Sequence, residues 1–412
     1  MRSFISEDDI EQAICNRLSQ PEYVWPDSYD KATFDDKSHR LFNHFVDMAV
    51  QGYGWVAKTI MKRMYVWMLA AILVCGASVF TSCLSNDVNP VTPPEEEAYT
   101  GIPLVIFDTD IGSSTDDLFS LEILHYYQQQ GRCKLLGVVV DREGEDCAAC
   151  ADVMNTYFNN GDVPIGLVRD GIKNPSVWID YKAMPTYTKD DDTPMFARSI
   201  DDYSALPDGW QLYRRLLAAQ PDHSVSICSV GFTACLAQLL ESVGDANSPL
   251  SGVELVRRKV KCLYIQGGSF GLSPEPDYNF LQGIGFAKTF FRLWPSDVDI
   301  IFDPMETGNG IEYLPEQVIS DVSWTDYHPI KQVYMTCNCN TGQMMWDPLT
   351  VINAVEGDDL FMLSDRGTVA LNDDATVVFT LSATGNSRVQ MPGDDAWRAV
   401  MLEKIRNVNK IH

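Results

Sequence analysis

Short apolar runs alternate with helical patterns along the chain from residue 101 onward. Runs such as IPLVIFD and CKLLGVVVD have the length of strands and end in an acidic residue. Because they are apolar at nearly every position, they predict strands buried on both faces, as in a parallel sheet. We expect strands at residues 102–108, 133–141, 163–168, 224–230, 260–268 and 297–304.

Between these runs, apolar positions recur every three to four residues, which predicts amphipathic helices. Alternating strands and helices predict an open, mostly parallel sheet with helices on both faces, and hence the α/β fold class. Residues 367–392 have the pattern of β-hairpin structure, a small antiparallel addition near the C-terminus. Helices are expected at residues 116–130, from about 146, and at 209–220, 232–243, 284–293 and 396–408.

The chain before residue 101 is organised differently. Residues 1–60 form a leader of doubtful origin, and residues 61–83 carry a short basic run, an apolar core and small residues before Cys83. This layout is typical of a secretory signal peptide, and the final cysteine resembles a bacterial lipobox. Residues 84–100 form a Pro- and Glu-rich linker, followed by the α/β domain at 101–412.

Two other interpretations of the apolar segment remain open, namely a buried helix and an uncleaved membrane span. The lipoprotein signal is favoured because it explains the basic start, the cysteine and the linker together. It predicts an exported lipoprotein, anchored at the periplasmic or outer-membrane face, whose real start lies near residue 61. Without cleavage, the apolar segment itself anchors the chain in a membrane.

The overall charge limits the classes of partner. Among 412 residues, 45% are hydrophobic and 21% are charged, with a formal net charge of −26. A nucleic-acid partner is not expected, because phosphate binding needs a basic surface. Most of the surplus acid is explained by a solvated surface, but it also permits a cation site.

The chain has eleven cysteines, and two groups of them have spacings that could serve zinc. These are Cys147 with Cys150, and Cys337 with Cys339. The first pair begins a predicted helix, where cysteine behaves as a small hydrophobic residue. We therefore favour a structural role for that pair.

The strongest chemical signal is DTDIGSSTDD, which directly follows the first predicted strand. Asp108, Asp110, Asp116 and Asp117 lie within ten residues, and so many carboxylates need a compensating charge. Oxygen ligands of this kind suit calcium or magnesium, and Gly112 allows the tight turn between the two pairs. A helix N-terminus alone would explain only the second pair.

Several motifs occur in an order that resembles the calcium-dependent nucleoside hydrolases, of the inosine-uridine preferring type. DTDIGSSTDD resembles the aspartate fingerprint of that family, and VGFTACLAQLL, YIQGG, PDYNF and MMWDPLTV resemble its later motifs. The resemblance covers most of residues 102–412. It implies a Rossmann-like fold, a Ca²⁺ cofactor and hydrolysis of the N-glycosidic bond of ribonucleosides or a related ribosyl compound, as in purine or pyrimidine salvage.

The resemblance also implies a role for individual residues. Asp110 would be the general base that takes a proton from a calcium-activated water. Carboxylates around the sugar would favour the oxocarbenium character that develops during cleavage. The implied metal ligands are Asp110, Asp117, the carbonyl of Ala234 and Asp347; the implied substrate-binding residues are Asp116, Asp277, Asn279 and Trp346; and Asp108 would support the cluster.

The sequence departs from the family where the leaving base would bind. Trp346 stands where other members have a histidine, and tryptophan can stack on a base but cannot act as an acid. Asp141-Arg142 replaces the frequent Gly-Asn after the second strand. His328 is a candidate replacement acid, although a single histidine more often has a structural role. These differences leave the identity of the base open.

Two alternatives compete with hydrolysis of a nucleoside. A haloacid-dehalogenase-type phosphatase also has Asp-x-Asp after its first strand, but Gly112 stands where that family needs Thr or Val. A lipid-anchored protein that binds nucleosides or sugars at a degenerate site is the second alternative. Retention of all the early aspartates and Asp347 favours the enzyme, and a homo-oligomer is compatible with the sequence.

The lipoprotein interpretation makes a direct prediction about the native N-terminus. If the signal is used, mass analysis of the protein from its native host should find an N-terminal peptide that begins at lipid-modified Cys83. A native peptide that extends through Cys83 without modification would contradict it.

Overall fold

The strand that precedes the aspartate motif, β1 (Leu104–Thr109), lies in the interior of the sheet and is buried along its whole length. The computed structural model describes residues 99–173, 175–337, 339, 341–357 and 360–410. Successive side chains of a strand point to opposite faces of a sheet. Val105 and Phe107 accordingly join one hydrophobic core, and Leu104 and Ile106 join the other. The unbroken apolar run therefore reflects burial on both faces.

The main sheet has ten strands in the order β11-β10-β12-β6-β5-β4-β1-β2-β3, with β9 paired to β12. Strands β1 to β6 are parallel to one another, and β3 lies at the edge of the sheet. The chain runs from β1 through β2 to β3 on one side and then returns to β4 on the other side of β1. Ligand sites of open α/β sheets form at such a reversal, at the carboxyl ends of the strands. The other strands of this parallel set are β2 (Lys134–Arg142), β3 (Ile165–Ile172), β4 (Val225–Ser229), β5 (Val260–Gln266) and β6 (Asp299–Asp303).

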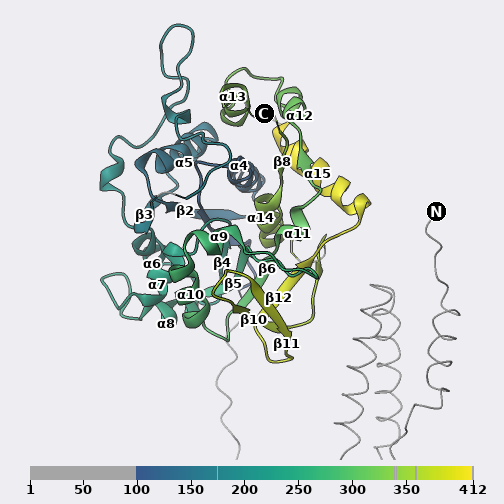
Figure 1. Ribbon diagram of the computed structural model, residues 1–412. Helices are drawn as coiled ribbons and strands as arrows, with labels where there is room; N and C mark the ends of the chain where they lie inside the picture. Colours follow the sequence, from purple (N-terminus) through teal and green to yellow (C-terminus); the bar gives the residue numbers. More distant parts are fainter. Residues whose placement is uncertain (1–98, 174, 338, 340, 358–359, 411–412) are drawn as a thin grey trace, which may run out of the picture. The chain divides into compact units, whose positions relative to one another are not determined.

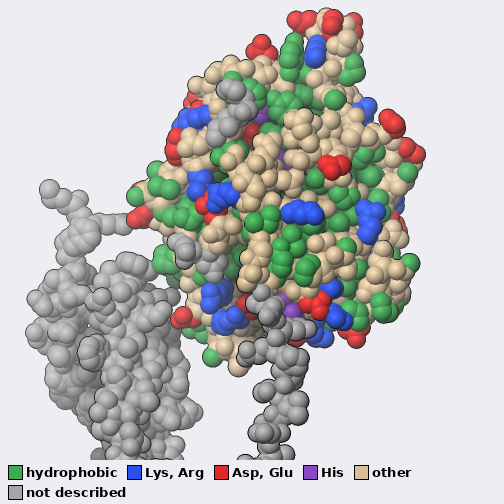
Figure 2. Space-filling model, turned by 180° about the vertical axis from the view of Figure 1, so that it is seen from behind, with side chains coloured by type: hydrophobic (Ala, Val, Ile, Leu, Met, Phe, Trp, Pro, Cys, Tyr) green, Lys and Arg blue, Asp and Glu red, His purple; other side chains and the backbone are tan. Residues whose placement is uncertain are grey.

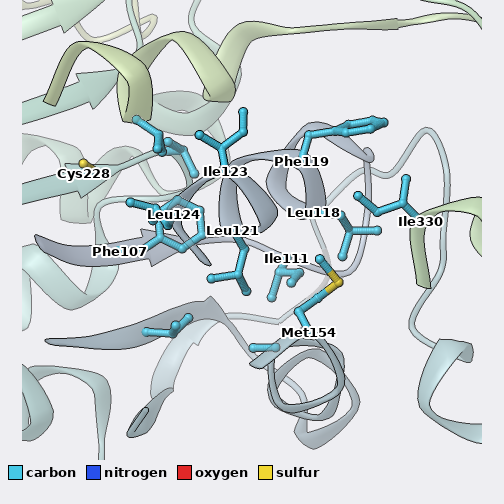
Figure 3. Close-up of a cluster of buried hydrophobic side chains, with 14 of the residues drawn as sticks. Phe107, Ile111, Leu118, Phe119, Leu121, Ile123, Leu124, Met154, Cys228 and Ile330 are labelled. Atoms are coloured by element: carbon cyan, nitrogen blue, oxygen red, sulfur yellow. The ribbon is translucent and has the colours of Figure 1, made fainter. Parts of the chain in front are cut away.

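Helices cover both faces of this sheet, as Figure 1 shows. The first hydrophobic core, drawn in part in Figure 3, lies under α4 (Asp116–Gln129), α5 (Glu145–Tyr157), α14 (Trp346–Glu356) and α15 (Asp395–Asn409). The second core lies under α6 (Gly209–Ala218), α7 (Ala234–Glu241), α8 (Gly252–Lys259) and α10 (Ile284–Leu293). Shorter helices are α9 (Tyr278–Gln282), α11 (Met305–Gly308), α12 (Pro315–Asp321) and α13 (Pro329–Thr336).

The C-terminal β structure is more closely integrated than the predicted hairpin. β10 (Gly367–Leu371) and β11 (Val377–Leu381) do form an antiparallel pair at one edge of the sheet. β12 (Ser387–Met391), however, runs parallel to β6 and thus continues the central sheet. The short β9 (Met362–Leu363) pairs with β12, and β7 (Glu312–Tyr313) and β8 (Gln343–Met344) form a separate two-stranded sheet.

The described residues of a long excursion between β3 and α6 include two 3-10 turns, η1 (Met184–Thr186) and η2 (Tyr203–Ala205). Its far end is held by Asp152, a fully buried residue of α5. The Asp152 carboxylate accepts hydrogen bonds from the backbone and hydroxyl of Ser199 at 3.0 and 2.7 Å, and from the Tyr203 hydroxyl at 2.7 Å. The excursion is thereby fixed against the helix layer although it has little regular structure.

The predicted α/β fold with a mostly parallel sheet is confirmed, and α10 spans the predicted residues 284–293. Cys147 and Cys150 are fully buried in α5, as expected for small hydrophobic residues. The leader, the signal-like segment and most of the linker lie outside the described residues. No helix in the described part of the chain has the length and apolar character needed to cross a membrane.

The surface of the described residues carries both signs of charge. On the face drawn in Figure 2, lysine and arginine side chains are scattered among acidic and uncharged ones and do not form one basic stripe. Several basic residues on the surface are paired with acids, such as Arg258 with Asp222 and Arg366 with Asp299.

Candidate active site

The aspartate motif forms a turn between β1 and α4, which we call the metal turn (residues 110–117). Gly112 has φ +127°, and a Cβ there would lie 2.9 Å from the Cys147 sulfur and 3.0 Å from Lys182 Cγ. Both the backbone conformation and the lack of space therefore require glycine. The turn folds back so that Asp110 and Asp117 lie at the same end of the sheet.

Two helix N-termini converge at the metal turn, and each brings carboxylates with it. α4 begins with Asp116 and Asp117, and α14 carries Asp347 in its first turn. The Thr115 backbone N–H, at the start of α4, donates a hydrogen bond of 3.3 Å to the Gln343 side chain, just before α14. Carboxylate oxygens of Asp116, Asp117 and Asp347 lie within 4.8 Å of one another.

Burial makes the charged form of these side chains costly. In the absence of a cation, it raises the pKa of Asp110 to about 6 and that of Asp116 to about 8. The pKa values of Asp117 and Asp347 lie well above the ordinary value, first because of burial and then because of repulsion by neighbouring aspartates. Asp116 Oδ1 is buried, and no group among the described residues forms a hydrogen bond with it. The cluster can therefore hold its full negative charge only beside a positive one.

The chain itself supplies only part of that compensation. The Thr109 hydroxyl donates a hydrogen bond to Asp117. Arg142, at the end of β2, is 2% exposed and lowers the pKa of Asp110 against the larger effect of burial. One guanidinium cannot balance four clustered carboxylates. Calcium binds oxygens at about 2.3–2.6 Å, so oxygens within 4.8 Å of one another can share one ion. The residues present thus fit a hard divalent cation.

Asp108, the predicted supporting residue, is fully buried near the end of β1. Its carboxylate accepts a hydrogen bond of 2.7 Å from the hydroxyl of Tyr213, and both residues are fully buried. Burial raises the pKa of Asp108 to about 8, and that of the neighbouring Asp141 well above the ordinary value. Asp108 is not among the residues that line the pocket.

The carboxylates form the floor of a pocket of about 590 Å³, a volume that includes its open mouth. Gly231 lets β4 approach this floor closely, because a Cβ there would lie 2.3 Å from the Asp110 nitrogen. Seven of the predicted site residues line the pocket. The lining residues are Asp110, Ser113, Ser114, Asp116, Asp117, Trp178, Val230, Gln266, Asp277, Tyr278, Asn279, Met305, Trp346 and Asp347.

Asp277 and Asn279 border the pocket and also hold its wall together. Asp277 caps α9, and its two oxygens accept hydrogen bonds from the backbone of Phe280 at 2.9 Å and Gly268 at 2.7 Å. Burial nevertheless raises the pKa of Asp277 to about 6. Asn279 donates hydrogen bonds to the carbonyl of Val230 at 3.0 Å and to the side chain of Gln266 at 2.9 Å. The turn that contains Asp277 and Asn279 is thus itself part of the pocket wall.

Aromatic side chains surround the mouth of the pocket. Trp346 is half-buried and packs against Gly308, and its indole N–H donates a hydrogen bond of 3.0 Å to Asn309. Trp178 is 71% exposed and lies with its ring centre 5.0 Å from that of Tyr278. Tyr278 and Gln266 belong to recognised motifs, but Trp178 stands in an irregular segment whose sequence pattern gave no signal.

Two residues considered in the sequence do not reach the pocket. Ala234 is the first residue of α7 and is not among the lining residues, whereas Val230, at the end of β4, is. The sequence motif after β4 does not by itself distinguish the backbone carbonyl of Val230 from that of Ala234. His328 is fully buried and lies 3.2 Å from Glu122 of α4, away from the pocket lining.

Comparison with solved structures shows the same fold in nucleoside hydrolases. The inosine-uridine preferring nucleoside hydrolase from Bacillus anthracis has a TM-score of 0.55 at 16% identity, over 75% of this chain and 99% of its own. The purine-preferring ribonucleoside hydrolase from Gardnerella vaginalis has a TM-score of 0.53 at 13% identity, over 75% and 100%. The type III effector protein XopQ, in complex with adenosine diphosphate ribose, has a TM-score of 0.52 at 15% identity, over 76% of this chain and 96% of its own. No protein-family model and no curated protein matches the sequence.

The raised pKa values predict how the stability of the cation-free protein depends on pH. Because Asp110 and Asp116 bind protons more tightly in the folded state, the free energy of unfolding should fall as pH rises from about 4 to 8. Each unit of raised pKa corresponds to about 1.4 kcal/mol. Urea denaturation at pH 5 and pH 8 in a chelator measures the effect. Asp116→Asn should reduce the fall, and an equal fall in the variant would contradict this account.

Proposed function

We propose that the chain is a calcium-dependent N-glycosidase that hydrolyses ribonucleosides, or a related ribosyl compound, to a base and ribose. The observation that carries the proposal is the buried cluster of Asp116, Asp117 and Asp347, with Asp110, on the floor of an aromatic-rimmed pocket. A fold shared with nucleoside hydrolases adds support. The cluster lies at the reversal of strand order, where sites of such sheets form.

The cation would be held by carboxylates from the two helix N-termini and the metal turn. Asp117 and Asp347 are the proposed ligands from the helices, and Asp110 is the proposed ligand from the turn. We assign the backbone carbonyl ligand to Val230 in place of Ala234, because Val230 lines the pocket. When bound, calcium lowers the pKa of a water molecule and orients vicinal hydroxyls.

Asp110 would act as the general base in the hydrolytic step. It takes a proton from water while the water oxygen bonds to the anomeric carbon. The bond from that carbon to the base nitrogen breaks, and its electron pair leaves with the base. Asp116, Asp277 and Asn279 would hold ribose hydroxyls, since all three line the pocket around the same floor. The negative charge of ionised Asp116 and Asp277 would also favour the oxocarbenium character of the ring.

The leaving base would bind between the aromatic side chains of the mouth. Trp346 and the Trp178–Tyr278 pair present flat apolar surfaces beside the carboxylate floor. Such surfaces favour a planar heteroaromatic base, and stacking can stabilise it as it leaves. His328 is buried elsewhere, so we do not assign it the role of acid.

We also propose that the domain acts as an exported lipoprotein, on the strength of the segment that ends at Cys83. An extracytoplasmic nucleoside hydrolase would release bases and ribose for uptake and salvage. Mass analysis of the native N-terminus tests this proposal independently of the chemistry.

Replacing the proposed base separates an enzyme from a binding protein. Asp110→Asn should lower kcat by about 10²–10⁴-fold while the variant still binds nucleoside, because it removes a proton acceptor. The rate of base release from purine and pyrimidine nucleosides, monitored by absorbance in the presence of calcium, measures the effect. Asp162→Asn, at an exposed position outside the site, is the control. If the wild type binds nucleosides but releases neither base nor ribose, the binding-protein alternative is correct.

The aromatic mouth predicts a second, distinct effect. Trp346→Ala should lower kcat/KM for a nucleoside by about tenfold, because an aromatic stacking partner contributes about 0.5–1.5 kcal/mol. Trp346→Phe should retain most of the activity. Trp178→Ala should have a smaller effect, since this side chain is mostly exposed. Steady-state kinetics with a purine nucleoside would measure these changes in kcat/KM. Unchanged kinetics in Trp346→Ala would rule out stacking at this residue.

A further inference from the structure

The two edges of the main sheet end differently. At one edge, the excursion that follows β3 covers that strand, because the Leu167 N–H donates a hydrogen bond of 3.0 Å to the carbonyl of Pro207 and Leu167 forms a parallel bridge with Asp208. At the other edge lies β11, which pairs with β10 and with no other strand of the described residues. Figure 1 shows β11 as the last strand of the sheet, beside β10.

Alternate residues of β11 direct their backbone N–H and C=O groups away from the sheet. Hydrogen bonds at the two ends of the hairpin, from Asn372 to Thr376 at 2.8 Å and from Ser382 to Arg366 at 3.0 Å, fix which residues bond to β10. Because this bonding alternates along an antiparallel pair, every second residue of β11 bonds inward and the others face outward. The outward-facing residues are Val377, Phe379 and Leu381.

The sequence around β11 lacks the features with which proteins protect an exposed edge. Residues 375–387 contain no charged residue and no proline. The pairing of β11 with β10 is regular along its length, without a bulge. Two apolar side chains also face the solvent, since Val378 is 49% exposed and Leu381 is 69% exposed. An uncharged, regular and apolar edge is a template for pairing with another chain.

The charge of the protein favours a second copy of the same chain as the occupant of this edge. With a formal net charge of −26, two copies repel each other unless they meet at an uncharged surface. Residues 375–387 are such a surface. The same stretch offers no charge that could recognise a basic or an acidic partner. A contact between two copies therefore agrees with the charge pattern.

We propose that the chain forms a two-fold symmetric dimer in which the β11 strands of two copies pair antiparallel about Phe379. In this register the outward donors of each copy meet the outward acceptors of the other, so the same surface serves both copies. Leu381 then lies opposite Val377 of the second copy, and Val378 lies opposite Thr380. Apolar and β-branched cross-strand pairs of this kind stabilise sheets.

The proposed contact adjoins the wall of the pocket. The Asp277 N–H donates a hydrogen bond of 3.1 Å to the carbonyl of Ala375, two residues before β11 begins. A Cβ at Gly268, whose N–H bonds to the Asp277 carboxylate, would lie 3.0 Å from Val377 Cγ2. Pairing of β11 would thus hold the strand against which this part of the wall rests. Neither a cation nor a substrate takes part in the contact, so the dimer is expected whether or not the proposed function is correct.

A lysine on the exposed face of β11 tests the dimer. Sedimentation velocity of the full-length chain in a mild non-ionic detergent, over a range of protein concentrations, should find a wild-type dimer that dissociates on dilution. Val378→Lys should raise the dissociation constant by about tenfold or more, because the two lysines would lie diagonally across the strand pair on one face and repel each other. The side chain is already half-exposed, so the fold should be retained.

Val243→Lys is the matched control, because it makes the same substitution at a position that is 75% exposed and lies outside the sheet. It should leave the dissociation constant within twofold of the wild type. Hydrogen–deuterium exchange locates the contact independently of any substitution. A peptide that covers residues 376–382 should exchange more slowly in the wild-type dimer than in the diluted, monomeric protein.

Three results would overturn the proposal. A wild-type chain that is monomeric at every concentration would do so, and protection of β11 in that monomer would show that another segment of the same chain covers the edge. A dimer that both Val378→Lys and Leu381→Lys leave intact would place the contact elsewhere. A wild-type dimer without protection of residues 376–382 would do the same, and this measurement decides the question even if a variant fails to fold.

Discussion

The burial of several carboxylates at the end of β1 is the constraint on which the rest of the site depends. Removing carboxylates from water and placing them together is unfavourable twice, through lost solvation and through mutual repulsion. The chain offsets part of this cost with the positive ends of two helix dipoles, the Thr109 hydroxyl and the buried Arg142. The negative charge that remains uncompensated requires a cation. The surrounding fold positions the few carboxylates that carry this charge.

The doubly wound sheet explains why such a cluster can exist at all. The sheet fixes the end of β1 between β2 and β4, with a hydrophobic core on each face. Gly231 and Gly112 then allow backbone and side chains to approach where any other residue would collide. The floor of the pocket is therefore rigid by construction, whereas its mouth is built from side chains such as Trp178 that are largely exposed. Under the proposed function, a rigid floor would suit the constant sugar, and an exposed rim would suit variation in the base.

The sequence was informative where the physical requirement is local. A fully buried strand must be apolar throughout, so β1 was predictable, and a cluster such as Asp116 with Asp117 is conspicuous in any context. Long-range geometry was not predictable. Trp178 lies in a segment without periodicity, and the pairing of Ile179 and Tyr181 with the metal turn is a long-range contact that local sequence does not reveal. The choice between the carbonyls of Val230 and Ala234 depends on where α7 begins, and boundaries of elements are poorly encoded in local pattern. β12 joins β6 through a contact that a hairpin-like sequence does not reveal.

The bond between Thr115 and Gln343 joins residues 228 positions apart in the chain. An ion shared by the helices that begin beside these residues would close the same long loop, as a covalent cross-link does. Unlike a disulfide, this link would be present in a fraction of the molecules that is set by the calcium concentration of the surroundings. The lifetime of the folded chain, and its resistance to proteases, would then be a property of the medium as much as of the sequence.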